Sequence, residues 1–115
     1  MAQMFCQQVV PDLDLKAYAH QVGPYCLSDG ERAEIWTKDI EQFTARFPSV
    51  QHEKVKELLT SAQALGESFG GTAEVRVKGL PAGLGQPVFH KLKGDLAQGF
   101  MTIGATSGVE LGDGY

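Results

Sequence analysis

Hydrophobic residues recur at the three- and four-residue spacing of an amphipathic helix within residues 49–65. The apolar positions are Val55, Leu58, Leu59, Ala62 and Leu65. Polar and charged residues fill the positions between them, so this stretch is predicted to be a helix with one buried face. Gly66 is well placed to end that helix in a left-handed conformation, which costs glycine little.

The same spacing appears a second time near the C-terminus, at Phe89, Leu92, Leu96 and Phe100. Pro87 is expected at the first helical position, where its missing N–H is not needed. Gly104 is expected to end this helix of about four turns. Beyond it, Val109 and Leu111 alternate with polar residues and glycines, which predicts a short strand with one buried side.

Two other stretches alternate between apolar and polar residues, as half-buried strands do. In residues 13–22 one predicted side carries Leu13, Leu15, Ala17 and Ala19, and the other carries Asp14, Lys16, Tyr18 and His20. In residues 72–78 the apolar side carries Ala73, Val75 and Val77.

The remaining stretches give shorter helical signals. Residues 2–9 resemble the last turns of a helix that Pro11 ends. Ser28 or Asp29 is expected to cap a short helix through Trp36. The apolar spacing of residues 40–47 predicts another helix, which ends before Pro48.

The order of these elements, with strands covered on one face, favours an α+β fold in which helices pack against an antiparallel sheet. At 115 residues the chain has room for one small domain, and residues 1–115 are read as a single partial domain. A net charge of −4 does not favour nucleic acid or an anionic membrane as a partner. No apolar run approaches the length needed to span a bilayer, and the N-terminus does not resemble a secretory signal. Cys6 and Cys26 are too few for a disulfide framework or zinc site, so a reducing cytoplasm is expected.

Residues 66–70, read as GESFG, match the G-x-S-x-G nucleophile elbow of hydrolases around Ser68. An elbow requires a strand before the serine and a helix after it, whereas the predicted order is the reverse. A helix end that leads into a strand is the preferred interpretation. A small hydrolase that uses Ser68 remains an alternative, which requires Ser68 to be exposed beside a histidine.

The glycines of residues 79–85 could cradle a phosphate, but Gln86 and Pro87 stand where a P-loop has lysine and a hydroxyl residue. A tight structural connection is preferred. His20, His52 and His90 lack the spacing of a helical metal site, so they are read as solvated or packing residues. Nothing marks Glu67, Glu74 and Glu110 as a coupled carboxylate pair, and Trp36 and the phenylalanines are read as core.

Residues 79–115 carry a longer pattern, GLPAGLGQPVFHKL, followed after the helical stretch by GVELGDGY. This pattern resembles the middle of the chorismate synthase family, which typically shows G-L-G-E-P-V-F-D-K-L and then M-S-I-x-A-V-K-G-x-E-x-G-x-G-F. The agreeing positions are Gly83, Leu84, Gly85, Pro87, Val88, Phe89, Lys91, Leu92, Met101, Ile103, Ala105, Gly108, Glu110, Gly112, Gly114 and Tyr115. The departures are Gln86 for Glu, His90 for Asp, Thr102 for Ser, and Thr106 and Ser107 for Val-Lys.

The resemblance implies a lyase of the shikimate pathway, which serves aromatic amino acid biosynthesis. Chorismate synthase converts 5-enolpyruvylshikimate 3-phosphate, a small phosphorylated substrate, to chorismate and phosphate with the help of reduced FMN. The family fold is a β-α-β sandwich with helices between antiparallel sheets, and its members assemble as tetramers.

The family's T-W-G-E-S-H-G, R-S-S-A-R-E-T and K-P-T segments, which carry substrate and flavin contacts, are not among these 115 residues. The chain is therefore expected to be an internal fragment or truncated member of the family. We expect no catalytic, cofactor-binding or metal-binding residue in it, and no appreciable affinity for FMN or substrate by itself. The alternative from another class is a stand-alone non-enzymatic domain with the same fold and a binding or assembly role.

Overall fold

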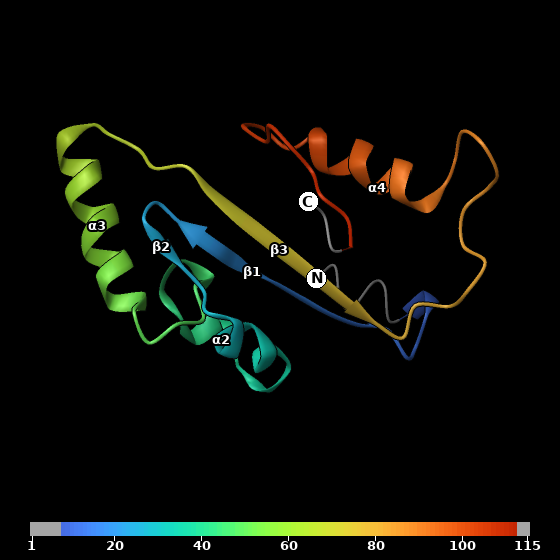
Figure 1. The fold of residues 1–115 in the computed structure, drawn as a ribbon, viewed down its shortest axis with the longest axis horizontal. Coiled ribbons are helices and arrows are strands. Elements are labelled where there is room, and N and C mark those ends of the chain that lie inside the picture. The colour runs from blue at the N-terminus through green and yellow to red at the C-terminus, as the bar shows by residue number, and fades with distance from the viewer. Residues whose placement is uncertain (1–7, 113–115) are drawn as a thin grey trace. The chain divides into compact units, whose positions relative to one another are not determined.

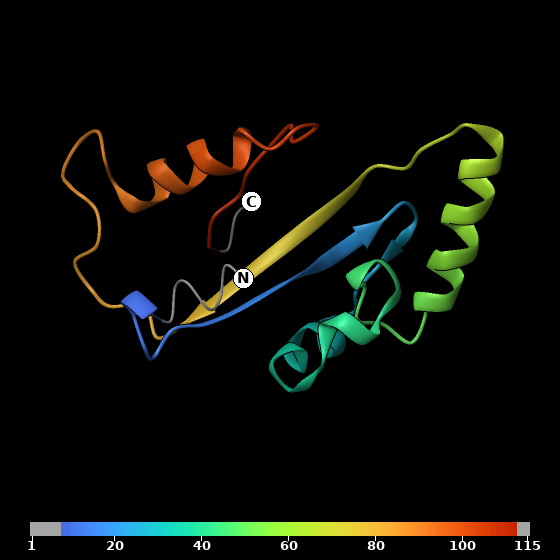
Figure 2. The same ribbon diagram turned by 180° about the vertical axis from the view of Figure 1, so that it is seen from behind.

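The computed structural model of the chain describes residues 8–112 (Figures 1 and 2). The chain divides into two compact units, of which the first ends at Leu80 and the second begins at Pro81. The first unit contains the sheet and most of the helical turns. The second contains a glycine-rich loop and one α-helix. Most of the helix predicted at residues 2–9 lies outside the described residues.

A three-stranded antiparallel sheet organises the first unit. Its strands are β1 (Asp14–Val22), β2 (Tyr25–Cys26) and β3 (Gly71–Lys78), in the order β2-β1-β3. β1 lies beside β3 along its whole length, and the short β2 pairs with the end of β1 (Figure 1). The strands predicted at residues 13–22 and 72–78 are thus confirmed.

The face of the β1–β3 pair that is buried differs from the predicted one. Tyr18, placed on the polar side of the predicted strand, is only 2% exposed and is the one buried residue within β1. On the apolar side, Val75 and Val77 of β3 remain 40% and 41% exposed. Leu13 of the predicted apolar side is buried, at 6% exposed, but Val75 and Val77 are not, because the segment that follows β2 covers the side that carries Tyr18.

That covering segment begins with α2 (Asp29–Ala33), which Ser28 caps. The Ser28 hydroxyl accepts a hydrogen bond from the Glu31 backbone N–H, and the Glu31 side chain accepts one from the Ser28 N–H, so the two form a capping box. α2 ends at Ala33 rather than continuing through Trp36, and a 3₁₀ helix, η1 (Ile35–Thr37), follows it.

Residues 40–47 form two 3₁₀ helices instead of the single predicted helix. These are η2 (Ile40–Gln42) and η3 (Thr44–Arg46). Ala45 and Arg46 have positive φ values of 56° and 54°, which a continuous right-handed helix does not allow. The predicted apolar residues still reach the core, since Ile40 is 3% exposed and Phe47 is fully buried.

The core of the first unit lies between the sheet, this segment and α3 (His52–Leu65). Its buried members are Tyr18, Leu27, Ile35, Ile40, Phe47 and Val55. α3 lies at the end of the sheet where β1 and β2 join, as both views show (Figures 1 and 2). The predicted helix is confirmed, with Val55 and Ala62 buried and Gly66 in the left-handed conformation at φ 70°.

The second unit begins with a loop and continues into α4 (Leu92–Met101), which starts five residues later than predicted. Pro87 does not begin the helix, because Val88 has a φ of 69° and the Gln86 N–H donates to the His90 carbonyl at 2.7 Å. These features close a turn that brings Gly85 opposite Lys91 before the helix can start.

The second unit contains no buried residue in the part that the structure describes. Phe89, predicted to be a core residue, is 87% exposed, and Leu96 is 40% exposed. The strand predicted around Val109 and Leu111 is absent from residues 102–112, where the backbone forms turns and irregular structure. The apolar stripe of α4 is present in the sequence but is not covered within its own unit.

The described residues thus form an α+β arrangement of three α-helices and a three-stranded antiparallel sheet, as predicted. None of the helices in this part of the chain has the length and apolar character that crossing a bilayer requires.

Candidate functional site

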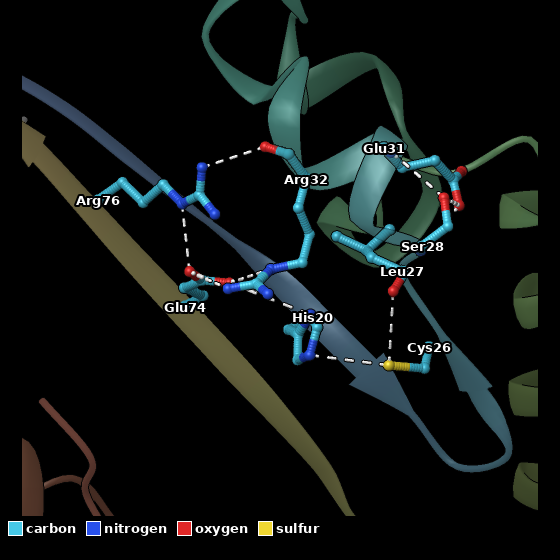
Figure 3. Close-up of polar contacts among 8 residues, drawn as sticks. All are labelled: His20, Cys26, Leu27, Ser28, Glu31, Arg32, Glu74 and Arg76. Atoms are coloured by element: carbon cyan, nitrogen blue, oxygen red, sulfur yellow. Dashed lines mark hydrogen bonds and ion pairs between the residues drawn. The ribbon is translucent and has the colours of Figure 1, made fainter. Parts of the chain in front are cut away.

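A group of polar side chains occupies the sheet face that α2 covers, and we call it the Glu74 cluster. Its members are Tyr18, His20, Arg32, Glu74 and Arg76. The Arg32 guanidinium donates to the Glu74 carboxylate from Nε at 3.2 Å and from Nη2 at 3.0 Å (Figure 3). Arg76 donates from Nε to the same carboxylate at 3.1 Å and from Nη1 to the Arg32 carbonyl at 3.1 Å. These bonds attach α2 to β3.

The cluster shifts the protonation equilibria of two of its members. Burial by itself would raise the pKa of Glu74, but its interactions with Arg32, Tyr18 and Arg76 outweigh burial and lower that pKa to about 2. Burial, reinforced by the Glu74 carboxylate, raises the pKa of Tyr18 to about 12. The Tyr18 hydroxyl is itself buried, beside this carboxylate. At neutral pH Glu74 is therefore ionised and Tyr18 is neutral.

His20 connects the cluster to the exposed thiol of Cys26. Its Nε2 lies 3.7 Å from the Cys26 Sγ, and its Nδ1 lies 4.0 Å from a Glu74 carboxylate oxygen (Figure 3). The Nδ1 atom is buried without a hydrogen-bond partner in the described chain. The sequence pattern did not predict this contact. His20 and Cys26 lie six residues apart, on the two sides of the β1–β2 turn, whereas Glu74 lies far along the chain on β3.

The structure does not give Ser68 the geometry of a nucleophile elbow. Gly66 ends α3 in the left-handed conformation, and β3 begins at Gly71, so a helix precedes the serine and a strand follows it. Ser68 itself is exposed. The preferred interpretation, a helix end that leads into a strand, is confirmed.

The glycine-rich loop forms a tight connection, as predicted. Gly79, Gly83 and Gly85 have φ values of 77°, 82° and 88°, which favour glycine. A side chain at Gly79 would collide with the Asp12 carbonyl oxygen, so this position also requires the smallest residue. At the other end of the loop, the Gln86 N–H is used in a bond to the His90 carbonyl and does not point to an open cradle.

The other candidate residues take structural or exposed positions. His52 accepts a hydrogen bond at Nδ1 from the Thr44 N–H at 3.4 Å and packs edge-on against Phe43, as a packing histidine does. His90 Nδ1 lies 3.4 Å from a carboxylate oxygen of Asp95 beside a shallow surface hollow.

Trp36 packs against the core of the first unit, with the Lys78 ammonium 4.2 Å from its ring centroid. Glu67 and Glu110 are both exposed. Within the described residues, no three His, Cys, Asp or Glu side chains are grouped so that they could hold a metal ion.

Comparison with known proteins places the whole chain in one family. The family model described as chorismate synthase matches residues 1–115. The chain is 52% identical over 115 residues to the chorismate synthase of Bdellovibrio bacteriovorus, of which it covers 34%. It is 37% identical over 103 residues to that of Lachnospira eligens and 36% identical over 107 residues to that of Cereibacter sphaeroides, covering 28% of each.

These matches include 100%, 90% and 92% of the chain, respectively, although the chain spans only about a third of the length of these relatives. Since the family model matches every one of its residues, the chain belongs to the chorismate synthase family.

Proposed function

We propose that these 115 residues form the central part of a chorismate synthase, a lyase that converts 5-enolpyruvylshikimate 3-phosphate to chorismate and phosphate. The observation that carries this proposal is the match to the family over the whole chain, with 52% identity to a curated relative. The enzyme would act in the cytoplasm on a small phosphorylated substrate.

Within that enzyme we assign the described residues a scaffolding role. The two arginines with the best geometry for an anion, Arg32 and Arg76, already bind the Glu74 carboxylate and one backbone carbonyl. The helix α4 begins at Leu92 without a side-chain cap, beside the His90–Asp95 pair. The paired arginines therefore offer no free cationic group to a phosphate, and the cations at the start of α4 are the exposed Lys91 and Lys93.

Reduced FMN, which the family in general uses, would supply electron density while phosphate leaves the substrate. The described residues do not fit a flavin site, because the second unit has no buried residue that could wall one off from water and the arginines of the first unit are already paired. We therefore assign flavin and substrate binding to segments outside these 115 residues.

The exposed apolar surfaces support a place inside a larger assembly. Val75 and Val77 are partly exposed on one side of the sheet. Phe89 and Leu96 are exposed in the second unit. Burying such surface contributes about 25 cal/mol per Å². In the proposed enzyme, other segments of the sandwich or neighbouring subunits of the tetramer would cover these residues.

A chimera tests the proposal directly. The 115 residues would replace the matching segment of the Bdellovibrio bacteriovorus enzyme, and chorismate formation would be measured with reduced FMN. We expect activity within about ten-fold of the parent enzyme, because the substituted segment supplies scaffold and not reacting groups. A stable, correctly assembled chimera without activity would contradict the proposal and favour the alternative, a non-enzymatic domain with the same fold.

Flavin titration of the 115-residue chain by itself tests the assignment of the binding site. Fluorescence of FMN should show no binding in the micromolar range, whereas the chimera should bind. Micromolar affinity in the isolated chain would overturn the scaffolding role while leaving the family assignment intact.

A further inference from the structure

Three side-chain groups lie in a row in space, with the His20 imidazole between the Cys26 thiol and the Glu74 carboxylate (Figure 3). The Sγ–Nε2 distance of 3.7 Å is within hydrogen-bond reach for sulfur, and the thiol also donates to the Leu27 carbonyl oxygen at 3.7 Å. The Nδ1–Oε2 distance is 4.0 Å. A nucleophile beside a base, with the base beside a third polar group, is the arrangement that activates thiols in proteins. The three residues come from three different strands, so the sheet holds them in place.

The surroundings of these three residues favour a reactive thiol over a structural one. Cys26 is exposed, so a reagent in solution can reach its sulfur. His20 Nδ1, next to Glu74, is buried and has no hydrogen-bond partner in the described chain. Such an atom carries a desolvation cost, and a proton on Nδ1 would direct an N–H toward the Glu74 carboxylate.

We propose that Cys26 is a nucleophilic thiol, with His20 as its base, that forms mixed disulfides with low-molecular-weight disulfides. The Sγ proton moves to His20 Nε2, and the resulting thiolate attacks one sulfur of the disulfide. A new S–S bond forms at Cys26, the bond of the reagent breaks, and the second sulfur leaves as a thiolate that takes up a proton. The reagent is the oxidant, and Cys26 is the group that is oxidised.

The charged groups around His20 are one carboxylate and two guanidiniums. Glu74 of β3 faces Nδ1, and Arg32 of α2 and Arg76 of β3 are held against that same carboxylate. These arginines would attract an anionic reagent and so raise its reaction rate without any activation of the thiol. The test therefore requires a neutral disulfide.

The experiment uses the full chain with Cys6→Ser, which leaves Cys26 as its one thiol. The neutral reagent 2,2′-dithiodipyridine releases one coloured thione for each mixed disulfide, so absorbance gives the second-order rate constant. We expect the folded chain at pH 7 to react about ten-fold faster than the same chain in urea, after correction with free cysteine in both solvents. An ordinary thiol is only a few per cent thiolate at this pH.

Two histidine variants separate activation from folding. His20→Asn should bring the folded rate down to that of the unfolded chain, because it removes the base. His52→Asn changes a histidine with nearly the same exposure, 27% against 28%, that lies away from the thiol. It should leave the folded-to-unfolded ratio unchanged. A purely structural His20 would alter the urea transition but not this ratio.

The proposal is overturned if the folded chain reacts no faster than the unfolded one, or if His20→Asn keeps the fast rate. A cooperative urea transition by circular dichroism verifies the folded state of each variant. The same labelling in the chimera, with the Cys26 peptide quantified by mass spectrometry, repeats the measurement in an assembled enzyme. A slow rate in the chimera also rejects the proposal.

Discussion

The helices α3 and α4 carry similar apolar stripes in sequence but differ in what covers them. In α3, Val55 is fully buried and Ala62 is 5% exposed, because the core of the first unit packs against that face. In α4 no residue is buried, and Leu96 is 40% exposed. The spacing of apolar residues therefore predicts which side of a helix is suited to burial, but it does not predict whether the helix's own unit covers that side.

The two faces of the sheet differ in the same way. The polar side of β1 and β3 is covered by the segment that carries α2, and it contains the buried Tyr18 and the paired Glu74. The apolar side, which contains Val75 and Val77, is partly exposed. In the enzyme that we propose, whose relatives are about three times as long as this chain, other segments would cover these apolar faces.

The largest expected effect comes from a pair of phenylalanines, one in each unit. Phe47→Ala should destabilise the first unit by about 4 kcal/mol, because Phe47 is fully buried and its removal leaves a cavity. Phe89→Ala should change stability by less than about 0.5 kcal/mol, since Phe89 is 87% exposed. Urea unfolding of the isolated chain measures both. Equal losses for the two variants would show that the second unit has a core of its own.

A pair of glycines sharpens the comparison at the loop. Gly79→Ala should cost about 3 kcal/mol, because the new methyl group would collide with the Asp12 carbonyl in addition to the strain of a positive φ. Gly83→Ala has a similar φ but meets no atom within 4 Å, so it should cost about 1 kcal/mol or less. Thermal unfolding of the two variants checks this difference. A Gly83→Ala loss as large as that of Gly79→Ala would contradict it.

A pair of carboxylates compares a covered ion pair with an exposed one. Glu74→Gln should cost about 2 kcal/mol at pH 7, because it weakens charged hydrogen bonds to Arg32 and Arg76. Asp95→Asn, in the exposed pair with His90, should change stability by less than about 0.5 kcal/mol. Urea transitions at pH 7 measure both effects.

The pH dependence of stability tests the same carboxylate. The folded pKa of Glu74, about 2, lies below its ordinary value of 4.5, so its contribution is present above pH 4.5 and is lost as the pH falls toward 2. The Glu74→Gln chain should lack this part of the acid dependence. An acid profile identical in parent and variant would show that the cluster does not stabilise the fold.

Much of the first unit could be predicted from sequence because its signals are local. The strands at residues 13–22 and 72–78, the helix that ends at Gly66 and the Ser28 cap all depend on neighbours a few residues away. The buried side of β1 could not be predicted in this way, because it depends on Arg32, 42 residues from Glu74, and on the segment that carries it.

The failures in the second unit have a local cause and a distant one. Pro87 is a good first residue for a helix, but Val88 adopts a left-handed conformation and the turn to Lys91 delays the helix. The alternation around Val109 and Leu111 suggests a strand, yet a strand requires a partner to pair with. The Cys26–His20 contact was missed because strand pairing, and not spacing along the chain, creates it.

Hydrogen exchange tests the central claim most directly, because it measures the stability of α3 and α4 separately in one sample. α3 is packed on a core, whereas α4 has ten residues and none buried, and so short a helix is marginal by itself. In the isolated chain we predict α3 amides that exchange at least about 100-fold more slowly than α4 amides. In the chimera α4 should become as protected as α3. Equal protection of the two helices in the isolated chain would contradict the account.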